Sequence, residues 1–228
     1  MKKYLATSIL FLQLINSIAQ APVKPVEPVS FTQGKVIYRI TYLNVDFIEQ
    51  VKPYMPTEMV LQYNPGFSKS EIKAASGGNL TLYNAKDGIT RILMNLKGQN
   101  VAMKIAADEM AKSISSSLPP HVVQLTKETK KIAGVVCKMA RVVYIDSAFY
   151  NMSFELYYTD RIKAKAPYFN PYKEIKGLPM VIQMMQNGMY MRFEAVQVIA
   201  EKTPDKEFIT PEGYREIDQK EYLELISN

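Results

Sequence analysis

Apolar and polar residues alternate along many short runs of this 228-residue chain. In residues 35–42, Val36, Tyr38, Ile40 and Tyr42 fall on one face, while the other face is mostly polar. A period of two is typical of a β-strand with one buried face. Further runs, separated by turn signals, are 59–63, 67–73, 80–83, 89–96, 101–105, 122–129, 135–145 and 152–159. The pattern predicts a mainly β (α+β) fold built from antiparallel hairpins.

Asn187 and Gly188 stand between two apolar runs and predict the turn of a hairpin. Asn-Gly favours a type I′ turn, because both central residues of that turn need positive φ. A two-residue loop here pairs Gln186 with Met189, Met184 with Met191, Ile182 with Phe193 and Met180 with Ala195. The other face then pairs Gln183 with Arg192 and Val181 with Glu194. The sequence therefore predicts a hairpin with one apolar, methionine-rich face and one polar face.

The methionine-rich face has two interpretations. Methionine is flexible and polarizable, and adaptable binding surfaces use it often, so the face is a candidate lining for an apolar ligand. A methionine stripe at strand spacing is more often ordinary core packing than the lining of a pocket. The candidate ligand-binding residues on this face are Met180, Ile182, Met184, Met191 and Phe193.

Two segments depart from the strand pattern. Residues 106–117 contain helix-forming residues but end in serines before Pro119, so a short helix and a loop are both compatible with them. Residues 218–221 match a capping box, and Tyr222, Leu223 and Ile226 follow at a spacing that suits one side of a helix. We expect a short C-terminal helix there.

The N-terminus has the three parts of a secretory signal peptide: Lys2 and Lys3, an apolar run, and small residues before Gln20. We expect cleavage after Ala19, leaving residues 1–19 as the signal peptide. A membrane anchor is the alternative, but the apolar run is shorter than the roughly 20 residues that a spanning helix needs. We expect no transmembrane segment after cleavage. Residues 20–33 follow as a proline-rich extended leader, either a tether or a docking segment, and 34–228 form one β domain.

Composition excludes several kinds of chemistry. The net charge of +6 falls to +4 once Lys2 and Lys3 are removed, and export makes a nucleic-acid partner implausible. One histidine, His121, and one cysteine, Cys137, make no recognisable zinc site, and no nucleophile, phosphate-loop or calcium-loop motif is present. We expect no catalytic residues, no metal and no cofactor, and we expect Cys137 to be a buried thiol.

Asp146, Ser147 and Ala148 match the acceptor pattern for O-glycosylation in some Gram-negative envelope systems. The short motif is equally compatible with a plain turn. Ser147 is the candidate modification site.

Four stretches resemble the GLPGLI family and related uncharacterised bacterial envelope domains. They read KIAGVVCK at 131–138, ELYYTD at 155–160, PYKEIKGLP at 171–179 and FITPEGY at 208–214. After residues 177–179 this chain continues with Met180 instead of Gly, so it departs from the family's own motif. Such domains are similar to periplasmic lipoprotein carriers of the LolA type. The resemblance implies a curved antiparallel sheet or half-open β-barrel around an apolar cavity, with short helices.

These observations predict an exported, non-enzymatic protein of the Gram-negative cell envelope that binds a lipid or acylated ligand. The alternative is an interaction subunit of an outer-membrane or secretion assembly, which contacts its partners through the leader or an exposed sheet edge. We expect a periplasmic location, or alternatively one at the cell surface in association with the outer membrane.

Overall fold

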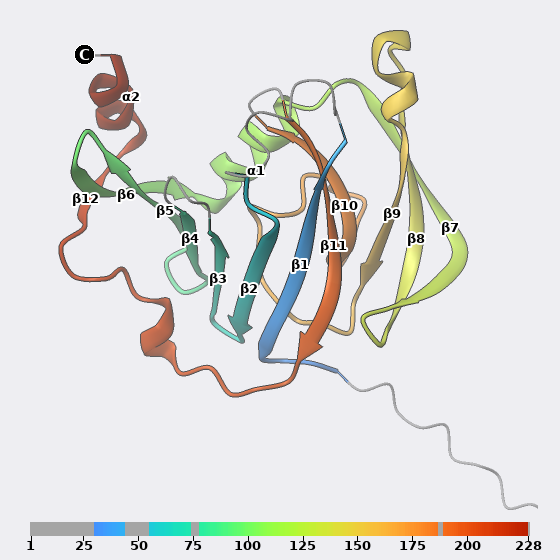
Figure 1. Cartoon of the computed structure of the whole chain (residues 1–228), viewed down its shortest axis with the longest axis horizontal. Coiled ribbons are helices and arrows are strands. Elements are labelled where there is room, and N and C mark those ends of the chain that lie inside the picture. The colour runs from blue at the N-terminus through green and yellow to red at the C-terminus, as the bar shows by residue number, and fades with distance from the viewer. Residues whose placement is uncertain (1–29, 44–54, 74–77, 187–188, 228) are drawn as a thin grey trace, which may run out of the picture.

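The computed structural model describes residues 30–43, 55–73, 78–186 and 189–227 (Figure 1). Within these ranges twelve strands form one sheet, in the spatial order β12-β6-β5-β4-β3-β2-β1-β11-β10-β9-β8-β7. The strands are β1 (Gly34–Tyr42), β2 (Glu58–Asn64), β3 (Phe67–Ile72), β4 (Asn79–Asn84), β5 (Ile89–Leu96), β6 (Gln99–Ala106), β7 (His121–Ile132), β8 (Val135–Tyr144), β9 (Phe154–Thr159), β10 (Leu178–Gln186), β11 (Met189–Ile199) and β12 (Arg215–Ile217).

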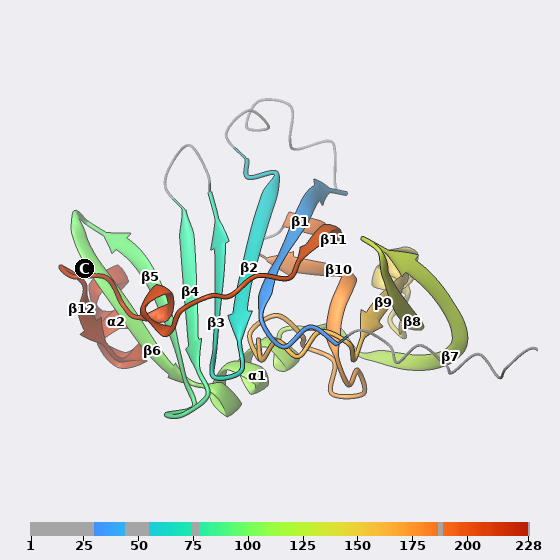
Figure 2. The ribbon, with the colours of Figure 1, turned by 90° about the horizontal axis from the view of Figure 1, so that it is seen from below.

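The sheet is open, and it does not close into a barrel. Its end strands, β12 and β7, each pair with a single neighbour among the described strands. All neighbouring pairs are antiparallel except β12 and β6, which run parallel. Figure 2 shows the strands arching around one side of the molecule. The predicted mainly β fold with a curved antiparallel sheet is confirmed, and the short parallel strand β12 is an element that the alternation pattern missed.

The hairpin of β10 and β11 has the predicted register. Met184 pairs with Met191, and Ile182 pairs with Phe193. The loop residues Asn187 and Gly188 lie outside the described residues. Because a slip of one residue would move every side chain to the other face, the agreement in register also fixes which residues lie toward the core.

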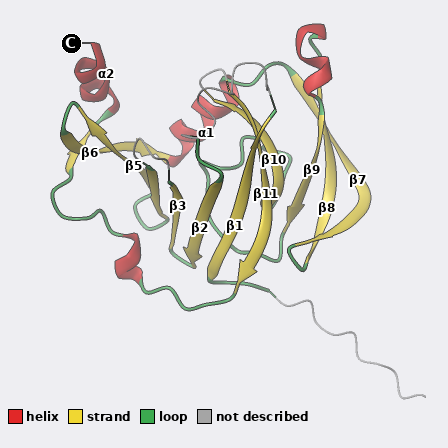
Figure 3. Cartoon of the chain, viewed as in Figure 1, coloured by secondary structure: helices red, strands yellow, loops and turns green. Residues whose placement is uncertain are grey.

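The helices form where the sequence contains helix formers and a cap. α1 (Ala107–Ser116) is a helix, which settles the choice left open for this segment, and its Met110 is buried. α2 (Gln219–Ser227) is the predicted C-terminal helix. It begins after Asp218, whose carboxylate accepts a hydrogen bond from the Glu221 N–H at 2.8 Å, as an N-cap does. Figure 3 shows these helices with the short 3₁₀ helices η3 (Ser147–Met152) and η4 (Asp205–Phe208).

The two faces of the sheet are covered differently. The inner face, which carries Tyr38 and Tyr63, forms the main core together with an irregular segment between β9 and β10. The outer face carries Phe67, which stacks on Phe208 of η4, and a smaller cluster around Leu82. The chain after β11 therefore covers the outer face on its way to β12, and the inner face is covered by the irregular segment, α1 and, over β6, Tyr222 and Leu225 of α2.

Candidate functional site

Residues 160–177, the inner segment, connect β9 to β10 without a helix or strand of their own (Figure 2). Four of its side chains are buried in the main core: Ile162, Phe169, Tyr172 and Ile175. The Phe169 ring lies 5.1 Å from that of Tyr38 and 5.7 Å from that of Phe193, edge to face in both cases. Such ring pairs add to the free energy of burial, so Phe169 anchors the inner segment in the core.

Hydrogen bonds hold the inner segment in place. The Asn170 amide donates to the Ile175 carbonyl at 2.9 Å, and its oxygen accepts from the Tyr172 N–H at 3.2 Å. The Ser115 hydroxyl of α1 donates to the Pro171 carbonyl at 3.0 Å, which ties the segment to the helix. The segment therefore has one defined path, although it lacks a hydrogen-bond ladder of its own.

The N-terminal leader contacts the start of the inner segment. Phe31 donates its N–H to the Arg161 carbonyl at 2.8 Å, and its own carbonyl accepts from the Lys163 N–H at 2.9 Å. The leader before residue 30 lies outside the described residues, as does the predicted signal peptide. At Phe31, the end of the leader is therefore joined to the inner segment by backbone hydrogen bonds, which a freely moving tether would not make.

Gly177, Leu178 and Pro179 form the junction between the inner segment and β10. A Cβ atom at Gly177 would lie 2.4 Å from the Thr159 carbonyl oxygen, so only glycine allows the two chains to approach this closely. Leu178 is buried in the core, and the Pro179 carbonyl accepts a hydrogen bond from the Tyr38 hydroxyl at 2.8 Å. The motif that carried the family resemblance is thus a backbone junction between two strands.

A groove of about 450 Å³ lies where β4, α1, the inner segment and the start of β10 meet. We call it the inner groove. It is lined by Tyr83, Ala111, Ala164, Lys165, Ala166, Pro167, Asn170, Ile175, Lys176, Gly177, Leu178 and Pro179. Tyr83 is half-buried, whereas Lys165 and Lys176 are exposed. The groove therefore combines apolar walls with an aromatic side chain and two amines.

Hydroxyl groups follow the inner face next to the groove. Tyr63 pairs with Ser68, Ser68 with Tyr83, and Tyr83 with Thr90, so the four side chains form one row across β2 to β5. Ser68 donates to the Lys165 carbonyl at 2.5 Å. Within the described residues, the buried hydroxyls of Tyr63 and Thr90 have no hydrogen-bond partner. The sheet under this part of the inner segment is consequently more polar than the rest of the core.

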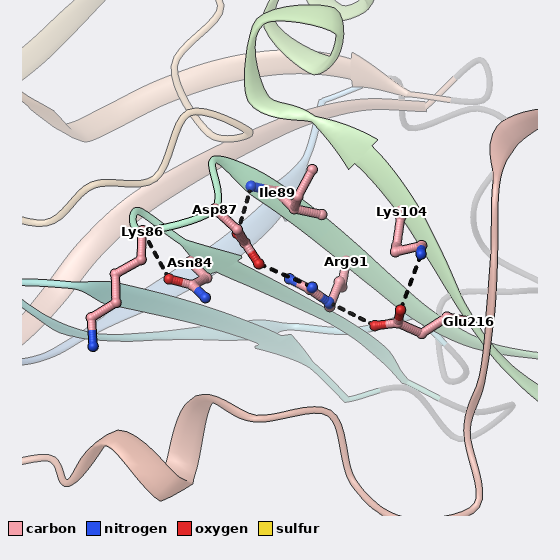
Figure 4. Close-up of polar contacts among 7 residues, drawn as sticks. All are labelled: Asn84, Lys86, Asp87, Ile89, Arg91, Lys104 and Glu216. Atoms are coloured by element: carbon pink, nitrogen blue, oxygen red, sulfur yellow. Dashed lines mark hydrogen bonds and ion pairs between the residues drawn. The ribbon is translucent and has the colours of Figure 1, made fainter.

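Ion pairs fix the loop that follows Tyr83 (Figure 4). Arg91 bonds both Asp87 and Glu216 at 3.0 Å, and Lys104 lies 3.1 Å from the Glu216 carboxylate. Hydrogen bonds from Arg91 and Lys104 hold the pKa of Glu216 below its ordinary value. These contacts attach β12 to β5 and β6. The carboxylates of Asp87 and Glu216 are both paired with basic side chains.

The candidate ligand-binding residues lie together, as the hairpin register required. Met180, Ile182, Met191 and Phe193 are buried in the main core cluster, with Met180 and Ile182 fully inaccessible. Met184 is half-buried and packs against the same cluster. None of the five lines the inner groove. Ligand binding by this face stays a prediction.

The remaining candidate residues are separate from the groove. Ser147 is exposed as the first residue of η3, and the Asp146 carboxylate accepts the Ala148 N–H at 2.9 Å. This position is accessible, and its glycosylation stays a prediction. His121, at the start of β7, lies edge-on to the Tyr172 ring, 5.2 Å away. Across the described ranges no cluster of metal-binding side chains occurs, and no helix there is long and apolar enough to cross a membrane.

Cys137 is fully buried, which confirms the prediction. Burial raises the pKa of its thiol to about 11. Since the thiolate is the reactive species, we expect the folded protein to react very slowly with a disulfide reagent such as Ellman's reagent at pH 8. One thiol per chain should become reactive in urea. Rapid reaction of the folded protein would contradict the buried position of Cys137.

Comparison with known proteins assigns the chain to a family. A family model described as the N-glycanase peptide, N-terminal domain matches residues 92–224, which is more than half of the chain. The chain belongs to this N-glycanase N-terminal domain family. All groove residues except Tyr83 lie within the matched range.

Solved structures agree with this assignment at the level of the fold. Two crystal structures of PNGF-II, in space groups C2 and P21, each match with a TM-score of 0.52 and 17% identity over 86% of this chain. The chain spans about one third of the length of these proteins, 33% and 34% respectively. A LolA superfamily protein from Nitrosomonas europaea matches with a TM-score of 0.30 and 15% identity, over 81% of this chain and 91% of that one. No curated protein matches.

These comparisons do not confirm the GLPGLI label. Sequence reasoning also missed the inner groove, because its residues come from β4, α1 and the inner segment, which are far apart in the chain. One signal was available in the sequence. Residues 160–177 contain Pro167 and Pro171 and lack alternation, which indicates a long irregular connection, and such connections often carry binding residues.

Proposed function

We propose that this chain is an exported, non-enzymatic binding module that recognises a carbohydrate in the inner groove. The make-up of the groove carries the proposal: Tyr83 and two exposed lysines stand among apolar walls. Sugars present apolar C–H faces beside hydroxyl groups, so an aromatic ring and hydrogen-bond donors suit them together. The volume of about 450 Å³ also falls within the range of small-molecule sites, about 300–1,000 Å³.

Family membership supports the same class of ligand. The family is named for an N-glycanase, so a glycan is the ligand that the membership suggests. Glycoside hydrolysis generally needs two carboxylic acids placed on either side of the bond that breaks. The groove lining contains no aspartate, glutamate, histidine or cysteine. This composition favours binding over two-carboxylate glycoside hydrolysis at this site.

The test is direct binding of the mature chain to an immobilised panel of neutral and acidic oligosaccharides. We expect Tyr83→Ala to weaken binding by about tenfold or more, because aromatic anchors dominate many binding sites. Tyr157→Ala is the matched control, since Tyr157 is half-buried on β9, bonds Glu155 and lies outside the groove. The proposal fails if no saccharide is retained, or if both variants bind as the unaltered chain does.

A lipid or acylated ligand is the second candidate. The observation that favours it is that Phe169 of the inner segment, which has no helix or strand of its own, packs on the apolar inner face at Phe193. A ligand that displaced this segment would reach Met180, Ile182, Met191 and Phe193, beside the half-buried Met184. Replacing Met180 with aspartate separates this candidate from a closed core.

We further propose that the protein acts in the periplasm or at the outer-membrane surface. The signal-like N-terminus supports this proposal, and a binding module for extracellular or envelope glycans would function in either place. Fractionation of the host cell, with protease treatment of intact cells, distinguishes the two locations.

A further inference from the structure

The inner groove has a positive charge that its own lining does not balance. Of the twelve lining residues, two are lysines and none is a carboxylate. Lys165 and Lys176 are exposed, and among the described residues neither makes an ion pair. Both side chains are therefore available to a ligand that enters the groove.

Three carboxylates on the elements around the groove are engaged elsewhere, and a fourth, the exposed Glu109 of α1, does not line the groove. Asp87, in the loop after Tyr83, is bonded to Arg91 at 3.0 Å. Asp108, one turn before Ala111 on α1, lies 3.6 Å from Lys112. Asp160, at the start of the inner segment, accepts a bond from Lys138 at 2.8 Å, and this bond lowers the pKa of Asp160.

Glu174 is the remaining acidic residue of the inner segment. It is half-buried, and it does not line the groove. The same segment also carries Lys163 and Lys173, both exposed and both outside the groove lining. The inner segment therefore carries more positive than negative charge, and opposite charge in a ligand would be attracted to it.

We infer that the ligand of the inner groove is an acidic saccharide, whose carboxylate or sulfate group binds the ammonium groups of Lys165 and Lys176. The inference rests on the proposed function and narrows its ligand class. A lysine ammonium is a compact point charge with three hydrogen-bond donors and needs no planar partner. It can therefore bind a carboxylate or a sulfate. The Tyr83 ring supplies the contact for the sugar ring, and the two lysines select the charged form.

The experiment compares sugars that differ in charge alone. Calorimetry measures binding of the mature chain to an oligogalacturonate and to its methyl ester, and to a sulfated oligosaccharide and its desulfated form. We expect one of the acidic forms to bind about tenfold more tightly than its neutral partner, because hydrogen bonds to charged groups are the stronger ones. That preference should shrink as the salt concentration rises, since exposed charges are screened.

Two double variants with the same net charge locate the effect. Lys165→Gln with Lys176→Gln should remove the preference for the acidic form. Lys163→Gln with Lys173→Gln should keep it, because those lysines lie on the same segment but outside the groove lining. Circular dichroism of each variant checks that the fold is retained. We expect it to be retained, because all four lysines are exposed.

The outcomes separate the inference from the function on which it rests. Equal affinity for acidic and neutral partners, with loss of binding in Tyr83→Ala, would overturn the acidic ligand and leave carbohydrate binding standing. An equal loss of preference in both double variants would overturn the assignment to Lys165 and Lys176. Binding of no sugar in either pair or on the panel would overturn both.

Discussion

Replacing Gly177 with alanine should lower the free energy of unfolding by about 3 kcal/mol, the upper part of the usual range for overpacking. A Cβ atom there would lie 2.4 Å from the Thr159 carbonyl oxygen and 2.8 Å from its carbonyl carbon. Both atoms belong to backbone, and Thr159 pairs with Leu178 where β9 meets β10, so neither chain can move cheaply. Urea unfolding followed by circular dichroism measures the change.

Gly66→Ala is the control for this substitution. The nearest atom to a Cβ at Gly66 is the Asn64 side-chain oxygen at 3.9 Å, an ordinary contact. We expect this variant to unfold within about 1 kcal/mol of the unaltered chain, because it adds a methyl group without a backbone clash. Equal unfolding midpoints for the two variants would show that β9 and β10 do not approach as closely as described.

Replacing Met180 with aspartate should abolish cooperative folding. Met180 has no exposed surface and lies in the main core cluster. An unpaired carboxylate in such a position costs several kcal/mol or more, which is comparable to the whole stability of a domain, about 5–15 kcal/mol. Thermal unfolding and near-UV circular dichroism report whether a packed core remains.

Met185→Asp is the matched control, since Met185 lies on the same strand and is 43% exposed. We expect it to fold with a change of at most about 0.5 kcal/mol, as is usual for surface substitutions. If Met180→Asp folded as well as Met185→Asp, the methionine-rich face would be open to solvent. That result would favour the lipid-binding candidate, whereas unfolding of Met180→Asp alone would favour a closed core.

Local patterns predicted most of the sheet for a physical reason. In a strand the side chains alternate between the two faces, so the burial of Val36, Tyr38 and Ile40 follows directly from their spacing. The register of β10 and β11 was also predictable, because a two-residue turn determines which residues face each other. Likewise, Asp218 indicated the start of α2, since a cap acts within one turn of its helix.

The inner groove could not be predicted in this way. Tyr83, Ala111 and Lys176 come from three elements that meet only after the sheet has curved and the inner segment has packed under it. The parallel pairing of β12 with β6 is another long-range contact, and no period in the sequence marks it. Local spacing contains no information about contacts of this kind.

The sequence by itself determined the strands other than β12, the methionine hairpin with its register, the buried state of Cys137 and the C-terminal helix. Each of these depends on neighbouring residues or on a single turn. Only the tertiary structure decided that the sheet stays open, that residues 160–177 cover its inner face, and that Lys165 and Lys176 line one groove with Tyr83. These features depend on how distant segments pack, and packing is a property of the whole chain.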